Sequence, residues 1–309
     1  MIKVASQKVP AVPIFAAVLL ALLSALMGVW IRMMQTSFGT WQQVYLRILL
    51  AGLIAAVVFR KSFTWDVLRL VGGRAWMVYI IRAIFAYVIG VGFFTIAVEH
   101  AQLGTVAFVS SLPILGLLAW VLFRERVKLA TLPYIAFSIV GLVMLTGMNL
   151  ANFSLGWGET AAIICLLGFD IGVLMSRYHR KSFSIYQNTT LLLLVGWVPL
   201  FAVSIASHEP IFPTHVTISG WVGLACSSVF NVVILYLINY VFSHLKAYVA
   251  GNLLLLEGVF ALIIGFLVYG EVPTGVAMAG AGIILICGFM ISMVDGRGKR
   301  PELEGVNIG

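Results

Sequence analysis

The sequence predicts an all-α integral membrane protein in which ten transmembrane helices form two inverted five-helix repeats. Of its 309 residues, 62% are hydrophobic and only 10% are charged, and the mean hydropathy of +1.09 excludes a soluble globular protein. Many windows of about 20 residues carry almost no charge, which is the length that a helix needs to cross a bilayer. The two halves of the chain also resemble each other weakly. These three observations together predict the fold class.

Ten apolar segments are long enough to span a membrane. Each is expected to be a helix, because backbone polar groups must be satisfied internally in lipid. The segments lie at residues 13–34, 40–59, 75–98, 103–123, 129–147, 156–176, 186–206, 217–242, 247–269 and 274–293. The connections between them are too short to hold a folded domain. The chain therefore divides into a cytoplasmic N-terminal segment (1–12), a first five-helix repeat (13–147), a second five-helix repeat (156–294) and a cytoplasmic tail (295–309).

Basic residues occur in the connections on only one side of the predicted membrane. In chain order they precede span 1 (Lys3, Lys8), separate spans 2 and 3 (Arg60, Lys61, Arg69, Arg74), spans 4 and 5 (Arg124, Arg126, Lys128), spans 6 and 7 (Arg177, Arg180, Lys181) and spans 8 and 9 (Lys246), and follow span 10 (Arg297, Lys299, Arg300). The opposite connections contain no Lys or Arg. By the positive-inside rule, both termini of this multi-pass protein are cytoplasmic. The expected location is the plasma membrane, which is the bacterial inner membrane.

The second half of the chain matches the first at an offset of 145 residues. The matching pairs include Arg32 with Arg177, Gln42 with Gln187, Trp76 with Trp221, and Phe85 with Phe230. Each half holds five spans, an odd number, so the second half must cross the membrane in the opposite direction. Inverted repeats recur in transporters, which place the substrate site at the repeat interface near the middle of the membrane.

Composition and motifs exclude several function classes. The formal net charge is +8, but the basic residues lie in short loops as topology signals and do not indicate a nucleic-acid partner. The sequence has no GxSxG, no Walker motif, no GxGxxG after a strand and no metal-spaced His/Cys/Glu cluster. Cys165, Cys226 and Cys287 fall inside apolar segments and are expected to be reduced thiols. We therefore expect no enzyme, cofactor or metal, and active transport would use an ion gradient or substrate exchange.

The stretch from Ala247 to Glu271 is predicted to form one long apolar helix with a carboxylate, Glu257, near its middle. A carboxylate in hydrocarbon costs roughly 2.5–3.5 kcal/mol on insertion scales, so it usually faces a protein interior or a water-filled cavity. Desolvation favours the neutral form of a carboxyl group, which suits reversible protonation. Glu257 is therefore a candidate for coupling proton movement to substrate movement. The alternative is a structural carboxylate that binds an arginine or backbone groups.

Further ionisable residues fall within the predicted spans. Asp170, in span 6, is a candidate second coupling group or a partner for a substrate cation. Arg47 in span 2 and Arg82 in span 3 are candidates for binding a substrate carboxylate or phosphate, since guanidinium forms bidentate pairs with both. Gln43 lies four residues before Arg47 and shares its helix face. The alternative is a set of internal ion pairs, because the two arginines balance the charges of Asp170 and Glu257.

Span 8 contains three polar side chains that are candidates for hydrogen bonding to a polar substrate: Asn231, Tyr236 and Asn239. The alternative is that they join neighbouring helices, at about 0.6 kcal/mol for each hydrogen bond. Gln187 and Asn188 begin span 7 on its cytoplasmic side, which is a plausible position for a gate.

Three stretches of the sequence carry a family resemblance. They are YLRILLAGL with Arg47, FFTIAVEHAQLGTVAFVSSLPILGLLAWVLFRERV with Ala97, Pro113 and Glu125, and NYVFSHLKAYVAGNLLLLEGVFALIIGFLVYGEV with Glu257. Through these stretches, residues 13–294 resemble the EamA-like branch of the drug/metabolite transporter superfamily. Members usually have Glu-Pro where this chain has Glu257-Gly258, and Gly-Glu where it has Arg124-Glu125. The resemblance implies a ten-helix carrier, but not a particular substrate, in a superfamily that includes exporters of amino acids and other metabolites and some uptake systems.

The sequence therefore favours a secondary transporter that moves a small polar metabolite, such as an amino acid-like or other organic solute, by alternating access. Export is the favoured direction, and proton coupling is one candidate energy source. The expected partners are the small-molecule substrate, protons and membrane lipid. Two alternatives stay open: a non-transporting receptor or assembly partner built on a transporter fold, and a flippase-like carrier of a lipid-linked substrate. The sequence sets no oligomeric state.

Overall fold

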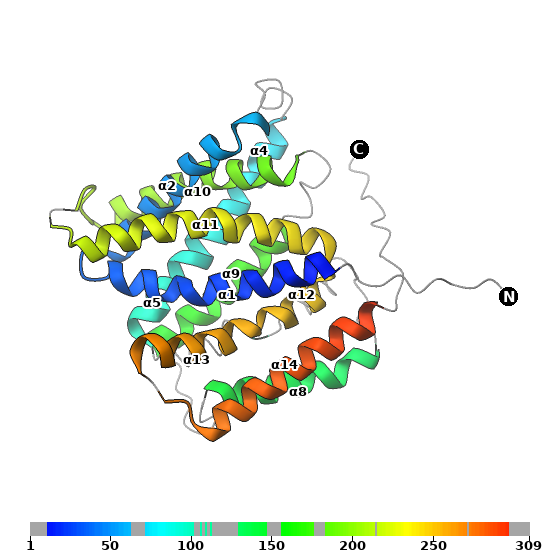
Figure 1. Ribbon diagram of the computed structural model, residues 1–309. Coiled ribbons are helices and arrows are strands. Elements are labelled where there is room, and N and C mark those ends of the chain that lie inside the picture. The colour runs from blue at the N-terminus through cyan, green and yellow to red at the C-terminus, as the bar shows by residue number, and fades with distance from the viewer. Residues whose placement is uncertain are drawn as a thin grey trace.

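The computed structural model (Figure 1) describes residues 11–62, 72–101, 106, 109, 112, 129–146, 156–175, 183–213, 215–270 and 272–296. All regular secondary structure in these ranges is helical. The same ranges contain nine helical segments that are long and apolar enough to span a membrane. The chain is thus an all-helical, multi-pass membrane protein, as its composition predicts.

Some of the predicted features lie outside the described residues. Span 103–123, with Pro113, is described only at residues 106, 109 and 112. Glu125 and Glu271 lie outside the described ranges, as does most of the N-terminal segment and of the C-terminal tail. The tenth span is therefore still a prediction.

The helices of the first half follow the predicted spans closely. The described elements are α1 (Ala11–Met34), α2 (Thr40–Val58), the short 3₁₀ turn η1 (Arg60–Ser62), α4 (Gly73–Ala83), η2 (Ile84–Gly92), α5 (Phe93–His100), the 3₁₀ turn η3 (Leu129–Thr131) and α8 (Leu132–Thr146). The elements α4, η2 and α5 follow one another directly and together form the third predicted span. The middle element, η2, is a π-helix, a rare conformation that often occurs at functional sites.

The second half contains one interruption that the hydropathy pattern does not indicate. Its helices are α9 (Trp157–Met175), α10 (Ile185–Ala206), α11 (Ile218–His244), α12 (Ala247–Leu254), α13 (Leu256–Tyr269) and α14 (Gly275–Gly296). The stretch that begins at Ala247 is not one uninterrupted helix, which corrects the prediction. The Leu255 N–H donates to the Asn252 carbonyl (3.3 Å), and the Gly258 N–H donates to the Leu255 carbonyl (3.1 Å). The backbone thus tightens to three-residue hydrogen bonds two residues before Glu257.

The helices pack in pairs that join the two halves of the chain (Figure 1). Helix α1 lies along α11, α2 lies along α10, α8 lies along α14, and α9 packs against η2 and α5. Glycines bring α9 close to η2: a Cβ added at Gly168 would lie 2.6 Å from the Ile89 side chain, and one at Gly172 would lie 2.9 Å from Ala86. Small residues let helix backbones approach closely in lipid, where van der Waals packing drives association.

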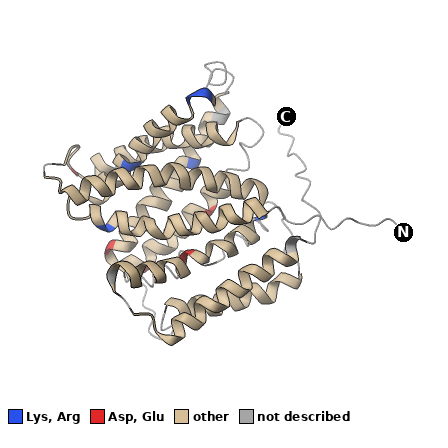
Figure 2. Ribbon diagram, in the orientation of Figure 1, with Lys and Arg blue, Asp and Glu red and all other residues tan. Residues whose placement is uncertain are grey.

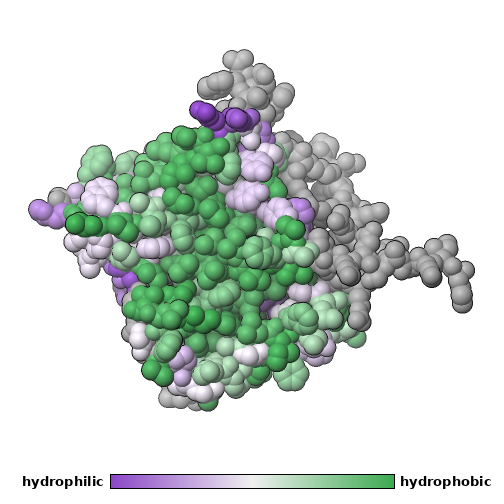
Figure 3. Space-filling view, viewed as in Figure 1, coloured by the Kyte–Doolittle hydropathy of each residue, from purple (hydrophilic) through white to green (hydrophobic). Residues whose placement is uncertain are grey.

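The outer surface of the bundle is apolar, as contact with lipid requires. Figure 3 shows a broad band of hydrophobic side chains across the visible face, and Figure 2 shows few charged positions on the helices. Phe15, Phe266 and Phe289 are 68%, 50% and 62% exposed. Polar side chains buried inside such a bundle are costly. Their positions therefore indicate where to look for a functional site.

Candidate functional site

A cavity of about 240 Å³ lies inside the bundle. Ten helical elements contribute side chains to its wall: α1, α2, α4, η2, α5, α9, α10, α11, α12 and α13. Helices α8 and α14 contribute none. Both halves of the chain therefore form the cavity, whereas the α8–α14 pair lies outside it.

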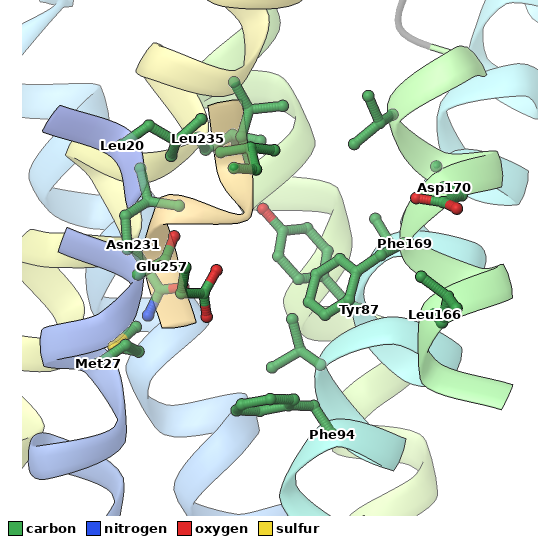
Figure 4. Close-up of a pocket in the computed structure, with 18 of the residues that line it drawn as sticks. Leu20, Met27, Tyr87, Phe94, Leu166, Phe169, Asp170, Asn231, Leu235 and Glu257 are labelled. Carbon is green, nitrogen blue, oxygen red and sulfur yellow. The ribbon is translucent and has the colours of Figure 1, made fainter. Parts of the chain in front are cut away.

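Five of the eight predicted site residues line this cavity: Arg47, Arg82, Asp170, Asn231 and Glu257. They come from five helices of both halves. In Figure 4, Glu257 and Asn231 lie on one side of the cavity and Asp170 lies on the other, with Tyr87 and Phe169 between them in this view. The structure thus brings together the ionisable residues that the sequence placed in separate spans.

The helix interruption determines the position of Glu257. Because α13 begins at Leu256, Glu257 lies in the first turn of this helix. The Gly258 N–H, directly after it, donates to the Leu255 carbonyl (3.1 Å), so the backbone beside Glu257 continues from α12 through one tightened turn. Asn231 of α11 donates from Nδ2 to the Ser227 carbonyl (2.8 Å), which leaves its amide oxygen as an acceptor on the same side of the cavity.

Asp170 of α9 is 8% exposed, and its Oδ2 atom has no hydrogen-bond partner among the described residues. It lines the cavity beside Phe169. A buried carboxylate oxygen normally accepts a hydrogen bond, and this oxygen has no donor among the described residues.

Arg82 of α4 is almost fully buried, and each of its three nitrogens donates to a neutral oxygen. Nε donates to the Gly172 carbonyl (3.0 Å), Nη1 to Oδ1 of Asn188 (2.9 Å) and Nη2 to Oδ1 of Asn239 (2.9 Å). The Tyr79 hydroxyl also donates to Asn188 Oδ1 (2.9 Å). This network, which we call the Arg82 network, joins α4 to α9, α10 and α11. These bonds engage three of the five N–H groups of the guanidinium.

Arg47 of α2 differs from Arg82, although it is buried to the same extent (1% exposed). Its Nε and Nη1 atoms are buried and have no hydrogen-bond partner among the described residues. Neither arginine forms an ion pair with Asp170 or Glu257 in the described part of the chain, so the structure does not contain the predicted internal ion pairs. Arg47 is thus a buried cation at the cavity wall without a protein partner in the described ranges.

Two predicted site residues, Tyr236 and Gln43, do not line the cavity. Tyr236 packs among Phe59, Tyr186 and Tyr240, with ring centroids 6.3, 5.4 and 6.4 Å away. This arrangement favours a role in helix packing. Gln43 is fully buried, and neither of its amide atoms has a partner among the described residues.

Asn239 also lies outside the cavity. It belongs to the Arg82 network, and its Nδ2 donates to Thr189 Oγ1 (3.1 Å). Of the two residues predicted at a gate, Asn188 is part of the same network. Gln187 instead pairs with Ser184 to cap α10 and donates to the Ser62 carbonyl (2.7 Å).

Sequence reasoning missed the aromatic side chains of the cavity. Tyr87 of η2, Phe94 of α5 and Phe169 of α9 line it (Figure 4), and the Tyr87 hydroxyl is buried without a partner among the described residues. A tyrosine in the middle of an apolar span was the available signal, since buried Tyr hydroxyls usually find a hydrogen bond. The other two rings could not be distinguished from lipid-facing phenylalanines by sequence.

The fold and the cavity together define a multi-pass membrane protein with a largely apolar pocket that holds a few ionisable side chains between helices of both halves, which is the arrangement of solute carriers. The model of the EamA-like transporter family matches residues 11–147 and 156–293. The chain therefore belongs to the EamA-like transporter family, within the drug/metabolite transporter superfamily. This confirms the family predicted from the sequence.

Two further comparisons agree with this membership. A WAT1-related chloroplastic protein of Arabidopsis thaliana is 26% identical over 206 residues, which cover 63% of this chain and 49% of that protein. The chain thus spans about half the length of this curated relative. A protein of known crystal structure has a similar fold, with a TM-score of 0.73 over 93% of this chain and 96% of that one, at 17% identity. At this identity the likeness concerns the fold alone.

Proposed function

We propose that this protein is a secondary transporter that exports a small polar metabolite across the plasma membrane by alternating access, and that it has no enzymatic activity. The observation that carries the proposal is the cavity itself, which Arg47, Asp170 and Glu257 line from helices of both halves. Intramembrane ionisable residues usually mark a substrate or ion pathway. The direction, export, is proposed on the basis of family membership.

Ten spans in two inverted five-helix repeats are part of the proposal. The packing pairs support it. If each span is replaced by the equivalent span of the other half, the pair of α1 and α11 becomes the pair of α9 with η2 and α5, and both pairs are in contact. Likewise, α2 with α10 and α8 with α14 each pair equivalent spans. Helix α1 begins and α14 ends at the same end of the bundle (Figure 1), as an even number of spans requires. We propose that this end is cytoplasmic, following the basic connections.

The size of the cavity favours a small solute. Ligand pockets for drug-sized molecules usually measure roughly 300–1,000 Å³, and this cavity measures about 240 Å³. A lipid-linked substrate would need a larger opening toward the bilayer. The volume therefore supports a metabolite and disfavours the flippase-like alternative.

Polar contacts flank the cavity along α11 and supply candidate gates. At the N-terminal end of this helix, Thr217 Oγ1 and Ser37 Oγ are hydrogen bonded (2.9 Å). Asn231 faces the cavity in the middle, and Asn239 of the Arg82 network follows toward the C-terminal end. At 1.5 Å per residue, Thr217 lies roughly 21 Å from Asn231 along the helix axis, and Asn239 lies roughly 12 Å from Asn231 in the other direction. In the proposed orientation, the Arg82 network closes the cytoplasmic side.

Counterflow measurements in proteoliposomes test the proposal. The wild-type protein is expected to exchange a labelled solute from a metabolite panel, and an imposed pH gradient is expected to accelerate the flux. Glu257→Gln removes the protonatable group and should keep exchange at equal pH while losing the response to the gradient. The matched control, Glu99→Gln, changes an exposed carboxylate at the end of α5 and should keep both.

Two results would contradict these expectations separately. If no solute of a broad panel shows counterflow with the wild-type protein, the transport proposal fails. If Glu257→Gln keeps the full response to the pH gradient, transport stands but the proton coupling through this residue is wrong.

A further inference from the structure

We infer that the cavity is selective for a small organic monocarboxylate, whose carboxylate group binds Arg47 and whose apolar part lies against the aromatic side chains of the wall. This inference rests on the proposed function and names the substrate class for the same site. Four observations carry it: the unpartnered guanidinium, the engagement of the second arginine, the two carboxylates in the cavity, and the largely apolar lining.

The first observation is the environment of Arg47. A buried guanidinium is expensive unless it is paired and hydrogen bonded, yet Nε and Nη1 of Arg47 have no partner among the described residues. The side chain lines the cavity, and Nε and Nη1 are covered in this structure, so a ligand would bind them through a rotation of the arginine side chain. Guanidinium presents its N–H groups as a planar fork that matches the two oxygens of a carboxylate. A bound carboxylate would supply the missing partner.

The second observation is that the protein already engages Arg82, so that Arg82 is the weaker candidate for binding an anion. All three of its nitrogens already donate to Gly172, Asn188 and Asn239. Among the described cavity residues, Arg47 is the cation whose Nε and Nη1 lack a partner. A phosphate monoester carries about −1.5 to −2 charges at pH 7, and one guanidinium neutralises only part of that charge. A single available cation therefore matches a monoanion better than a phosphate ester.

The third observation is the presence of Asp170 and Glu257 in the same cavity. Like charges that are brought together in a site of low dielectric repel each other strongly. The two carboxylates would therefore disfavour a ligand with a second negative charge, such as a dicarboxylate. They would accept a ligand whose other end is neutral or donates hydrogen bonds.

The fourth observation concerns the rest of the wall. Aliphatic side chains of α1 and α11 surround the cavity together with Tyr87, Phe94 and Phe169. The unpartnered hydroxyl of Tyr87 adds one hydrogen-bonding group. A compact apolar body with one charged end fits this distribution, because the apolar surface of the ligand is removed from water while its charge meets Arg47.

The experiment compares acids with their amides, which differ in charge but hardly in size. The probes are phenylacetate and phenylacetamide, 4-methylpentanoate and 4-methylpentanamide, and phenyl phosphate. Binding to the purified full-length protein in detergent is measured by isothermal titration calorimetry. In the wild-type protein, at least one acid is expected to bind roughly tenfold or more tightly than its amide, and phenylacetate should bind more tightly than phenyl phosphate.

Variants at Arg47 then test which side chain is responsible. Arg47→Gln should reduce the acid-to-amide preference to about one, and Arg47→Lys, which keeps the charge but loses the fork, should give an intermediate value. The matched control is Arg60→Gln, an exposed arginine of η1, which should keep the wild-type preference. If Arg47→Gln does not fold, as judged by size-exclusion chromatography, the comparison of Arg47→Lys with the wild-type protein carries the test.

Three results would overturn the inference: no acid binds more tightly than its amide, the preference survives both Arg47 variants, or phenyl phosphate binds more tightly than phenylacetate. Counterflow with the same protein separates this inference from the proposed function. Exchange of neutral or cationic solutes without any Arg47-dependent preference would leave transport standing and remove the carboxylate site. Arg47-dependent binding without exchange of any solute would leave the site standing and remove transport.

Discussion

The guanidinium of Arg82 in α4 donates from Nη2 to Oδ1 of Asn239 in α11, across 2.9 Å. This hydrogen bond joins the first half of the chain to the second beside the cavity that Arg82 lines. Both side chains are almost completely buried, so the bond is charge assisted and shielded from water. Such bonds are roughly twice as strong as neutral ones, which makes the Arg82 network a strong link between the halves.

Replacing Arg82 by lysine is expected to destabilise the protein. Lysine keeps the charge but not the planar fork, so at least one of the acceptors on Gly172, Asn188 and Asn239 would lose its donor. Hydrogen bonds to charged groups contribute about 1.5–3 kcal/mol each. The free energy of unfolding in detergent should therefore fall by about 1–3 kcal/mol. Arg60→Lys on the exposed turn η1 is the control and should change it little, and equal stability of the two variants would contradict the prediction.

Gly196 of α10 provides the space that the Tyr87 ring occupies. A Cβ at this glycine would collide with Cδ2 and Cε2 of the ring, so Gly196→Ala must displace the ring within the cavity wall. Overpacking of this kind typically costs about 1–3 kcal/mol, and we expect solute binding to weaken roughly tenfold as well. Gly28→Ala is the control, because nothing lies within 4 Å of its added Cβ. Calorimetric binding and thermal unfolding of both variants check the prediction, which is wrong if the two behave alike.

The α8–α14 contact should affect stability without affecting the site. A Cβ at Gly280 would lie 2.5 Å from the Leu145 amide nitrogen and 2.9 Å from the Met144 Cβ, so Gly280→Val should push α14 away from α8. A loss of about 1–3 kcal/mol is expected, with unchanged solute affinity in the folded fraction, since neither helix lines the cavity. Gly282→Val, where a Cβ meets nothing within 4 Å, is the control on the same helix. A change in affinity without a change in stability would refute this separation.

Glu209 caps α2 from the other half of the chain. Its carboxylate accepts hydrogen bonds from the backbone N–H of Trp41 (3.1 Å) and of Gln42 (2.6 Å), and also from the Ser204 hydroxyl (3.2 Å). An anion at a helix N-terminus pairs with the free N–H groups and the dipole. Glu209→Ala should therefore lower the free energy of unfolding by about 0.5–2 kcal/mol.

Denaturation in detergent, with Glu99→Ala as the control, measures this effect. Glu99 is exposed and accepts from the Thr40 hydroxyl (2.6 Å) instead of a backbone N–H, so its removal should cost less than about 0.5 kcal/mol. A larger loss at Glu99 than at Glu209 would show that the cap does not stabilise α2.

Sequence reasoning and structure differ most clearly around Glu257. The hydropathy pattern predicted one helix from Ala247, because residues 253–256 are all leucine and the stretch contains no proline. No local residue preference marks the interruption at Leu255, which is seen only in the backbone hydrogen bonds of the folded chain. It matters for the site because it moves Glu257 from a helix interior to a first turn.

The partners of the buried arginines also required the structure. The balance of two cations and two carboxylates favoured ion pairs, yet Arg82 bonds to neutral oxygens of Gly172, Asn188 and Asn239. A balance of positive and negative charges does not show which of the groups lie close together. Hydrogen bonding instead depends on which atoms lie within about 3 Å of each other.

By itself, the sequence determined that this is an all-helical membrane protein, where its described helices lie, which family it belongs to and which of its residues are costly to bury. These properties depend on short stretches of the sequence and on the bilayer that surrounds them, so the local sequence is sufficient to predict them. Only the tertiary structure decided that Arg47 lines the cavity without a partner in the described ranges, that Tyr236 lies outside it and that Tyr87 enters it. Successive residues of a helix point about 100° apart. The rotation of each helix against its neighbours, which hydropathy does not determine, therefore decides which side chains meet.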